Sequence, residues 1–238
     1  MNKNNNLKKA TLSDVKNYKE LRARLYSLSA EQDEERDLTA RQLSELDESL
    51  DWQPEVFKEG GKEGLKDLDG SILVPARFDA IATTFARHSA FADNPVIVVE
   101  GGRFGIVKAD GSGDMVLPCE HDHISVMRSA PHCYVVEDGG HKGVILGSGK
   151  QLIPQVADTL YDPCNGALIF KAGDRFGLWA EDYDLYVEPL YDDLDAELDA
   201  PFSAVKDGVS GYLSASDGHF ITEEEWEETE ERVLGCFI

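Results

Sequence analysis

The stretch Val135-Val136-Glu137-Asp138-Gly139-Gly140-His141-Lys142-Gly143-Val144 places a Gly-Gly pair between two short runs, the first of them rich in strand-forming residues. Glycine readily adopts the positive φ that two-residue hairpin turns require, so this stretch predicts a β-hairpin. The pattern Gly-Gly-x-x-Gly-hydrophobic recurs, with looser copies in the C-terminal half. Its anchor glycines are Gly64, Gly105, Gly143, Gly177 and Gly211. Their separations of 41, 38, 34 and 34 residues indicate an array of one repeated supersecondary unit.

Two further signals follow each anchor. A second turn comes first, as at Asp69-Gly70 and Asp110-Gly111, and a short apolar run with a proline comes next. Because proline has no N–H to donate, we expect the strand to stop at Pro75, Pro118, Pro154 and Pro189. An aspartate and then an apolar residue close the unit, at Asp79 and Ile81, Asp122 and Ile124, Asp158 and Leu160, and Asp192 and Leu194. Each unit therefore reads as a β-meander.

The fifth unit departs from this pattern. Glu223 stands where the proline is expected, and Trp226 stands where the aspartate is expected. Terminal units of repeat arrays are often atypical, because they have no further neighbour to pack against. The fold class predicted is mainly β, with five hairpin or meander repeats at about 55–94, 95–131, 132–165, 166–200 and 201–238. The unequal repeat lengths favour an open, solenoid-like stack, with propeller-like closure as the alternative.

The repeat pattern resembles the WG β-repeat family of bacterial proteins over about residues 55 to 230. Units of that family read as strand, turn, Trp-Gly-hydrophobic, Asp-x-Asp-Gly, a Val-Ile-Pro run and an aromatic-Asp-x-Ile closure. The family's tryptophan is replaced here by Glu63, Phe104, Lys142, Phe176 and Ser210, so the resemblance rests on the glycine, Asp-Gly and proline spacing. It implies a β-rich scaffold that shares no catalytic residues.

Residues 1–54 differ in kind and predict a helical pair. Thr11 with Asp14 forms a capping signal, and apolar residues recur at helical spacing from Val15 to Leu28. A second capping signal, Thr39 with Gln42, precedes Leu43, Leu46 and Leu50, and Pro54 is the expected end of the helical segment. We expect these helices to cap the first repeat; a partner-binding or dimerising role is the alternative.

Composition is that of a folded protein, with 42% hydrophobic and 9% aromatic residues. No apolar run is long enough to span a membrane, and no apolar segment follows the N-terminal lysines, so neither membrane insertion nor secretion is indicated. Cys119, Cys133, Cys164 and Cys236 lack the dense spacing of a disulfide framework. We therefore expect a cytoplasmic protein.

The net charge of −23 is concentrated at the C-terminal end. Residues 181–238 contain 18 acidic side chains against Lys206 and Arg232, a net charge of −16. A field of this sign repels nucleic acids and anionic lipid, and it attracts a basic protein. The alternative of equal weight is that the acidity only keeps a glycine-rich β-protein soluble.

Two clusters are candidates for metal binding. In an extended strand, Cys119, His121 and His123 would share one face, as a three-ligand zinc set requires, but the repeat pattern also explains these positions. We therefore predict no metal or other cofactor. Asp193, Asp195, Glu197 and Asp199 alternate with apolar residues, which predicts a carboxylate row on the outer face of a strand. Calcium is disfavoured because the glycine and ligand order of a calcium loop are missing.

No nucleophile elbow, Walker loop or dinucleotide fingerprint is present in the sequence, so we predict no enzymatic activity. We expect a protein-interaction module, and more specifically an immunity-type or regulatory protein that occludes a basic partner, such as a toxin or effector. The residues predicted to bind it are Asp192, Asp193, Asp195, Glu197, Asp199, Tyr183, Tyr186, Tyr191, Glu223, Glu224 and Trp226. The alternatives are a structural or receptor-like scaffold and a carbohydrate-binding repeat protein.

Overall fold

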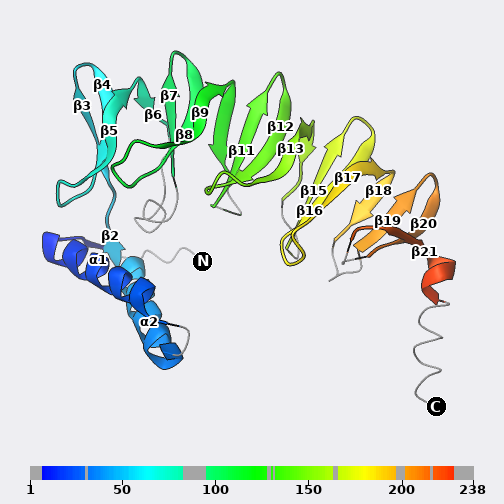
Figure 1. Ribbon diagram of the computed structural model, residues 1–238, viewed down its shortest axis with the longest axis horizontal. Helices are drawn as coiled ribbons and strands as arrows, with labels where there is room; N and C mark the ends of the chain where they lie inside the picture. Colours follow the sequence, from blue (N-terminus) through cyan, green and yellow to red (C-terminus); the bar gives the residue numbers. More distant parts are fainter. Residues whose placement is uncertain are drawn as a thin grey trace. The chain divides into compact units, whose positions relative to one another are not determined.

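The structure is a computed structural model that describes residues 7–29, 32–82, 95–127, 130, 132–162, 166–196, 202–214 and 217–227. In these residues the chain forms the helices α1 and α2, a helical turn at 223–227, one short parallel pair of strands and five antiparallel sheets (Figure 1). Contacts divide it into two compact units, Met1–Glu120 and His121–Ile238.

The helical segment comprises α1 (Leu12–Ser27) and α2 (Asp33–Ser49), framed by β1 (Lys8–Lys9) and β2 (Leu50–Asp51), which pair in parallel. The capping box predicted at Thr11 and Asp14 is confirmed. The predicted second cap is wrong, because α2 begins at Asp33 and Thr39 lies inside the helix. There its buried hydroxyl donates to the backbone oxygen of Glu35, 2.7 Å away. The acidic first turn of α2, which favours a helix N-terminus, was the better signal.

The helices have a small core of their own and are tied to the first sheet. Tyr18 and Trp52 pack edge to face, with ring centroids 5.3 Å apart. The indole nitrogen of Trp52 donates to Asp67, and Lys19 lies 2.9 Å from the other oxygen of that buried carboxylate and 2.6 Å from Asp69. These contacts place the helical segment and the first sheet in the same compact unit.

The first sheet has three strands and the other four have four each. The first contains β3 (Glu55–Glu59), β4 (Lys62–Lys66) and β5 (Ile72–Phe78). The second contains β6 (Ala80–Ile81), β7 (Val96–Glu100), β8 (Arg103–Val107) and β9 (Met115–His121). The third contains β10 (His123–Val126), β11 (Cys133–Asp138), β12 (His141–Leu146) and β13 (Gln151–Ala157). The fourth contains β14 (Thr159–Leu160), β15 (Ala167–Ala172), β16 (Arg175–Ala180) and β17 (Leu185–Tyr191). The fifth contains β18 (Asp193–Asp195), β19 (Phe202–Lys206), β20 (Val209–Leu213) and β21 (Phe220–Thr222).

The five anchor glycines occupy matching places, because each is the third residue of the strand that follows the first hairpin turn. A Cβ atom built on Gly177 would lie 2.7 Å from the backbone oxygen of Val187 on the next strand. At the other anchors the same atom would meet a third-strand backbone oxygen at 2.9 Å or less. The glycine is therefore needed for the close approach of two backbones, and not for a positive φ.

The prolines do not end their strands, so the prediction of a stop there is wrong. Pro75, Pro154 and Pro189 lie inside β5, β13 and β17, which continue beyond them. Opposite each of these prolines the pairing register shifts by two residues, as between Lys142↔Ala157 and Val144↔Ile153. Proline is tolerated at such a bulge in an edge strand because no ladder hydrogen bond is required of it there.

Within residues 121–238 the sheets pack face to face. Leu168, Phe170 and Trp179 of the fourth sheet pack against residues of the third sheet, while Leu178 and Val187 pack against the fifth. Alternate residues of a strand point to opposite faces, so an internal sheet of the stack needs apolar residues on both. In residues 1–120, the amide of Gly111 donates to the backbone oxygen of Leu73 and so links the first two sheets, at 2.8 Å.

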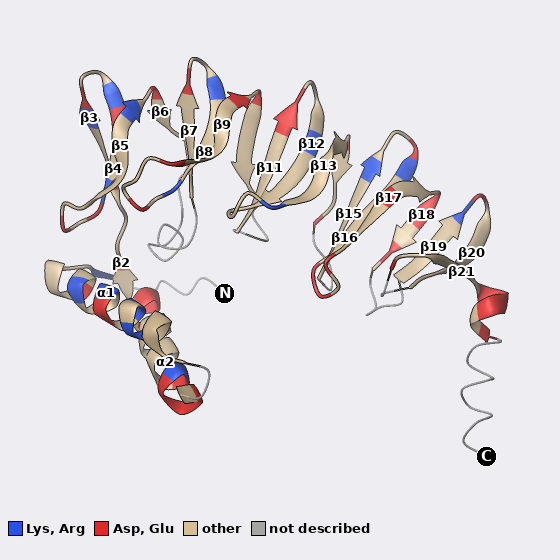
Figure 2. Cartoon of the chain, in the orientation of Figure 1, with Lys and Arg blue, Asp and Glu red and all other residues tan. Residues whose placement is uncertain are grey.

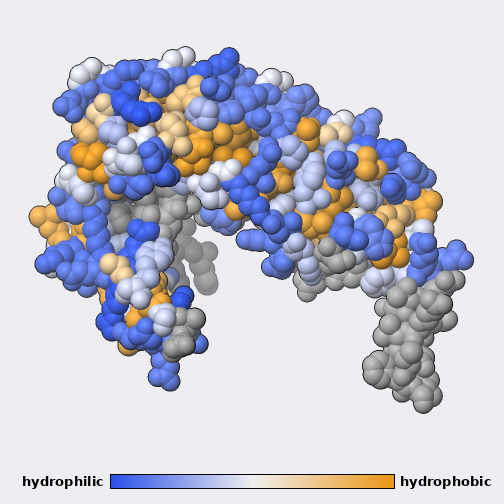
Figure 3. All heavy atoms as spheres, in the orientation of Figure 1, coloured by the Kyte–Doolittle hydropathy of each residue, from blue (hydrophilic) through white to orange (hydrophobic). Residues whose placement is uncertain are grey.

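Hydrophilic residues cover the hairpin ends of β3–β4 and β7–β8 in Figure 3, while apolar residues lie on the strands below them.

Candidate functional site

Each of the four-stranded sheets begins with a short strand, and the aspartate just before that strand is hydrogen-bonded to the hairpin that follows it. Asp192 precedes β18, and its carboxylate accepts a hydrogen bond from the amide of Gly208 in the turn between β19 and β20, at 2.9 Å. The same contact joins Asp79 to Gly101, Asp122 to Gly139 and Asp158 to Gly173, at 2.7–2.8 Å. The recurrent acidic position of the sequence is thus a joint between consecutive hairpins, which the sequence pattern alone did not reveal.

Asp192 is held in this joint from both sides. Its second carboxylate oxygen lies 2.6 Å from the guanidinium of Arg175, which also reaches Asp207 at 3.2 Å. Lys62 with Asp79 and His141 with Asp158 repeat the pairing of a basic residue with the joint aspartate. Asp192 was predicted to bind a partner, but the structure gives its carboxylate a role inside the molecule.

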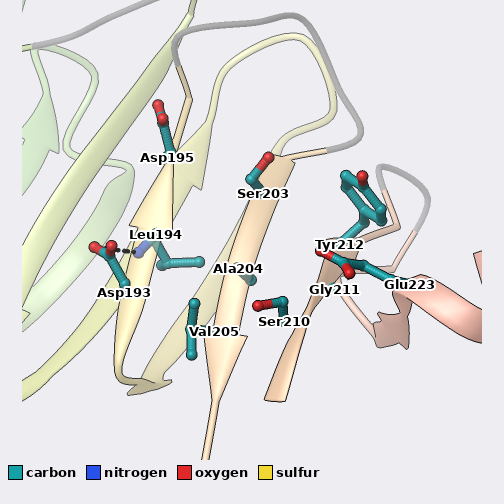
Figure 4. Close-up of a pocket in the computed structure, with 10 residues that line it drawn as sticks. All are labelled: Asp193, Leu194, Asp195, Ser203, Ala204, Val205, Ser210, Gly211, Tyr212 and Glu223. Atoms are coloured by element: carbon teal, nitrogen blue, oxygen red, sulfur yellow. Dashed lines mark hydrogen bonds between the residues drawn. The ribbon is translucent and has the colours of Figure 1, made fainter. Parts of the chain in front are cut away.

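The outer face of the last sheet carries the other predicted acids. Cross-strand pairs place Asp193 opposite Val205 and Asp195 opposite Ser203, so these side chains share the face that points away from the fourth sheet. Glu223 follows β21 at the end of the same face. Together with the strands beneath them, these residues line a cavity of about 240 Å³ (Figure 4). Its full lining is Asp193, Leu194, Asp195, Ser203, Ala204, Val205, Ser210, Gly211, Tyr212 and Glu223.

We call this cavity the groove. Its polar residues stand at positions where the preceding sheet has apolar residues. When Gly211 is matched to Gly177, Ser203 takes the place of Ile169 and Tyr212 takes the place of Leu178. Leu178 is completely buried against the fifth sheet, whereas Tyr212 is only partly buried. The last sheet therefore keeps an apolar inner face and has a polar, acidic outer face. Aligning the sequence on the anchor glycines would have revealed Ser203, Ser210 and Tyr212, which sequence reasoning missed.

The predicted aromatic residues fall in three different environments. Tyr191 is 4% exposed and belongs to the core between the last two sheets, so it is not a surface anchor. Tyr186 is partly buried and stacks on Phe170, and burial raises its pKa. Tyr183 is 48% exposed in the turn before β17.

Trp226 adjoins the groove. It lies in a helical turn at 223–227 that also contains the exposed Glu224, and it packs on Tyr212 with ring centroids 5.3 Å apart. Acidic residues colour both β18 and this turn in Figure 2. The structure thus brings Asp193, Asp195, Glu223 and Trp226 to one end of the last sheet. Glu197 and Asp199 lie outside the described residues.

The predicted metal ligands have other neighbours. The imidazole Nδ1 of His121 lies 2.7 Å from Asp138, and the side-chain amide of Gln155 donates to the same carboxylate oxygen, at 2.6 Å. Cys119 lies over Gly105, and burial is the main cause that raises the pKa of its thiol, which opposes the thiolate form that zinc binds. His123 is exposed on β10. In the described parts of the chain, no group of three His, Cys, Asp or Glu residues is arranged to hold a metal ion.

The comparisons with known proteins identify no family for this chain. No family model matches it, and no curated protein matches it. Among solved structures it is similar to Hsv2 of Kluyveromyces lactis, with a TM-score of 0.30 and 9% sequence identity. That match covers 72% of this chain and 60% of the Hsv2 chain. In the described residues, no helix combines the length and the apolar character needed to cross a bilayer.

Proposed function

We propose that this protein is a non-enzymatic, cytoplasmic protein-interaction module that binds a basic partner on the outer face of its last sheet. The observation that carries the proposal is the change from the apolar Ile169 and Leu178 to the polar Ser203 and Tyr212 at matching positions, beside exposed carboxylates. We also propose that the chain is a WG-type repeat protein, and the spacing of the anchor glycines supports this.

The negative charge around the groove indicates that the partner is basic. Asp193, Asp195 and Glu223 lie around one groove, in a segment of 58 residues with a net charge of −16. A surface of this kind increases the rate at which a basic protein associates, and it disfavours acidic partners. Tyr212 and Trp226 add a partly buried aromatic pair at the edge, which is the residue type that dominates many interface energies. An immunity-type or regulatory role follows if the partner's own functional surface is the basic one, because binding would then occlude it.

The test uses a short oligolysine peptide as a defined basic probe. The double variant Asp193→Asn/Asp195→Asn should weaken binding clearly more than the control Asp182→Asn/Glu188→Gln, which removes the same charge from exposed residues outside the groove. Screening reduces the Debye length from about 10 Å at 0.1 M salt to about 3 Å at 1 M. The association rate should therefore fall steeply with salt. Equal losses in the two double variants would show a diffuse field and no specific groove.

A carbohydrate ligand is the second candidate, and the same end of the sheet favours it. An aromatic pair beside carboxylates and the hydroxyls of Ser203 and Ser210 offers both a stacking surface and hydrogen-bonding groups. A glycan array probed with the wild type and with Tyr212→Ala distinguishes this candidate from the basic protein. If neither a glycan nor a basic probe binds, the polar face is only the end cap of a structural scaffold.

A further inference from the structure

The first sheet lacks a strand that every other sheet has. The second to fifth sheets each begin with a short strand, β6, β10, β14 or β18, that directly follows the last strand of the sheet before it. We call these four segments, with the aspartate that precedes each, the donor strands. The first sheet contains only β3, β4 and β5 (Figure 1), so within the described residues the outer edge of β3 has no donor strand.

The donor strands that begin with Asp79, Asp158 and Asp192 bind their sheets through the same backbone groups, whereas the amide of Asp122 donates to the side chain of Asp138, at 2.9 Å. The amide of Asp79 donates to the backbone oxygen of Val99 at 2.8 Å, and the amide of Ala82 donates to that of Ile97 at 2.8 Å. The carboxylate of Asp79 accepts from the amide of Gly101, at 2.7 Å. The corresponding amide contacts of Asp158 with Lys171 and Asp192 with Val205 are 2.8 Å and 2.7 Å.

An aliphatic residue two positions after the aspartate completes the donor strand. Ile81 pairs with Val98, and Leu160 and Leu194 pair with Phe170 and Ala204 in the same way. Cross-strand partners lie on one face of the sheet, so this residue adds an apolar contact to the backbone hydrogen bonds. A donor strand is therefore defined by Asp-x-Ile or Asp-x-Leu in extended conformation.

β3 presents the complementary groups at the matching positions. The pairing of Phe57 with Gly64 corresponds to that of Val98 with Gly105, so Val56, Lys58 and Gly60 match Ile97, Val99 and Gly101. Gly60 and Gly101 also share the same turn conformation, with φ of 59° and 60°. Among the described residues, no strand or carboxylate binds the outward backbone groups of Val56 and Lys58 or the amide of Gly60. Val56 is 44% exposed, whereas its counterpart Ile97 is buried.

We propose that the edge of β3 is a docking site for an extended segment of another protein that contains Asp-x-Ile or Asp-x-Leu. The segment adds a fourth strand to the first sheet. Its aspartate accepts from the amide of Gly60, its backbone pairs with Val56 and Lys58, and its aliphatic residue lies beside Phe57. The four donor strands within the chain show the chemistry that this edge recognises. Since all four are already paired in their own sheets, the occupant is a separate protein and not a second copy of this chain.

The probe is a fluorescent peptide that copies residues 76–82, Ala-Arg-Phe-Asp-Ala-Ile-Ala. On the full-length protein, its binding should weaken at least about tenfold when the peptide aspartate is replaced by alanine, because a charge-assisted hydrogen bond is lost. Amide NMR signals of residues 56–60 should shift, and those of Val56 and Lys58 should become protected from exchange. Equal binding of both peptides, or no binding of either, overturns the proposal.

A protein variant tests the edge itself. Lys58→Pro removes an N–H that points away from β4, because the equivalent Val99 faces the donor strand, and it should weaken peptide binding at least about tenfold. Lys58→Ala, which shortens the same side chain but keeps the N–H, is the control that should leave binding unchanged. If Lys58→Pro unfolds the hairpin, the two peptides on the unchanged protein still decide the matter. Shifts confined to β7, which would mean exchange with the chain's own strand β6, overturn the proposal, and so does a dimer that Lys58→Pro abolishes.

Discussion

The carboxylate of Asp192 accepts a hydrogen bond from the backbone amide of Gly208, and 16 residues of chain separate the two. Asp193, the next residue, points its side chain to the other side and lies on the outer face of the last sheet. Two adjacent acids thus have different roles, one in the joint between sheets and one at the surface.

This difference predicts unequal effects on stability. Asp192→Ala should lower the free energy of unfolding by about 1–2 kcal/mol, because it removes a hydrogen bond to a charged acceptor and an ion pair with Arg175. Asp193→Ala should change it by less than about 0.5 kcal/mol, as is usual for surface substitutions. Urea denaturation of both variants measures the difference, and equal losses would contradict the role of Asp192 as a joint.

The anchor glycines predict a steric effect. A Cβ at Gly177 would lie 2.5 Å from the ring of Phe170 and 2.7 Å from the backbone oxygen of Val187, so Gly177→Ala should cost about 1–3 kcal/mol. Gly173→Asn is the control, because φ is +59° there, nothing lies within 4 Å, and asparagine tolerates this conformation. A control variant that is as unstable as Gly177→Ala would show that turn conformation, and not the close approach, limits these positions.

The ion pair between helix and sheet makes a third prediction. Asp67 has a side chain only 1% exposed, and Lys19 lies 2.9 Å from it. Lys19→Met should destabilise the unit by about 1–3 kcal/mol, because it leaves a buried carboxylate without its cation. Lys16→Met, which removes an exposed pair with Glu20, should have almost no effect. Thermal unfolding of both variants checks this, and the fluorescence of Trp52, measured with Trp179 and Trp226 replaced by phenylalanine, reports whether the helical segment is released before the sheet unfolds.

A fourth prediction concerns pH. The side chain of His219 donates to Asp217 at 2.6 Å and, with further hydrogen bonds, lowers the pKa of that carboxyl from 3.8 to about 2. Since the folded-state pKa is depressed, the stabilisation is complete above about pH 4 and is lost as the pH falls towards 2. NMR titration should give Asp217 a midpoint near 2 in the wild type and a higher one in His219→Ala. His123→Ala should leave the midpoint unchanged.

The β-hairpins and the positions of their glycines could be predicted because they depend on local residue requirements. Gly139-Gly140 and its counterparts are at hairpin turns with positive φ, and the anchor glycines fall at one register position, since both follow from backbone sterics. The capping box of Thr11 and Asp14 is equally local. The start of α2 and the bulges at Pro75 and Pro154 were not predicted, because neighbouring strands and helices decide whether a capping residue or a proline is used as a stop.

The sequence by itself determined the β-hairpin units, their spacing and the excess of acidic charge, because each depends on residue type and short-range geometry. Tertiary structure decided which acids face solvent. Asp192 and Asp193 are adjacent residues of the same type, so the sequence does not distinguish their roles. Only the pairing of β18 with β19 turns the side chain of Asp192 towards Gly208 and that of Asp193 towards the groove. It also decided that β3 has an open edge, because a missing strand is recognised only when the other sheets are seen to have one.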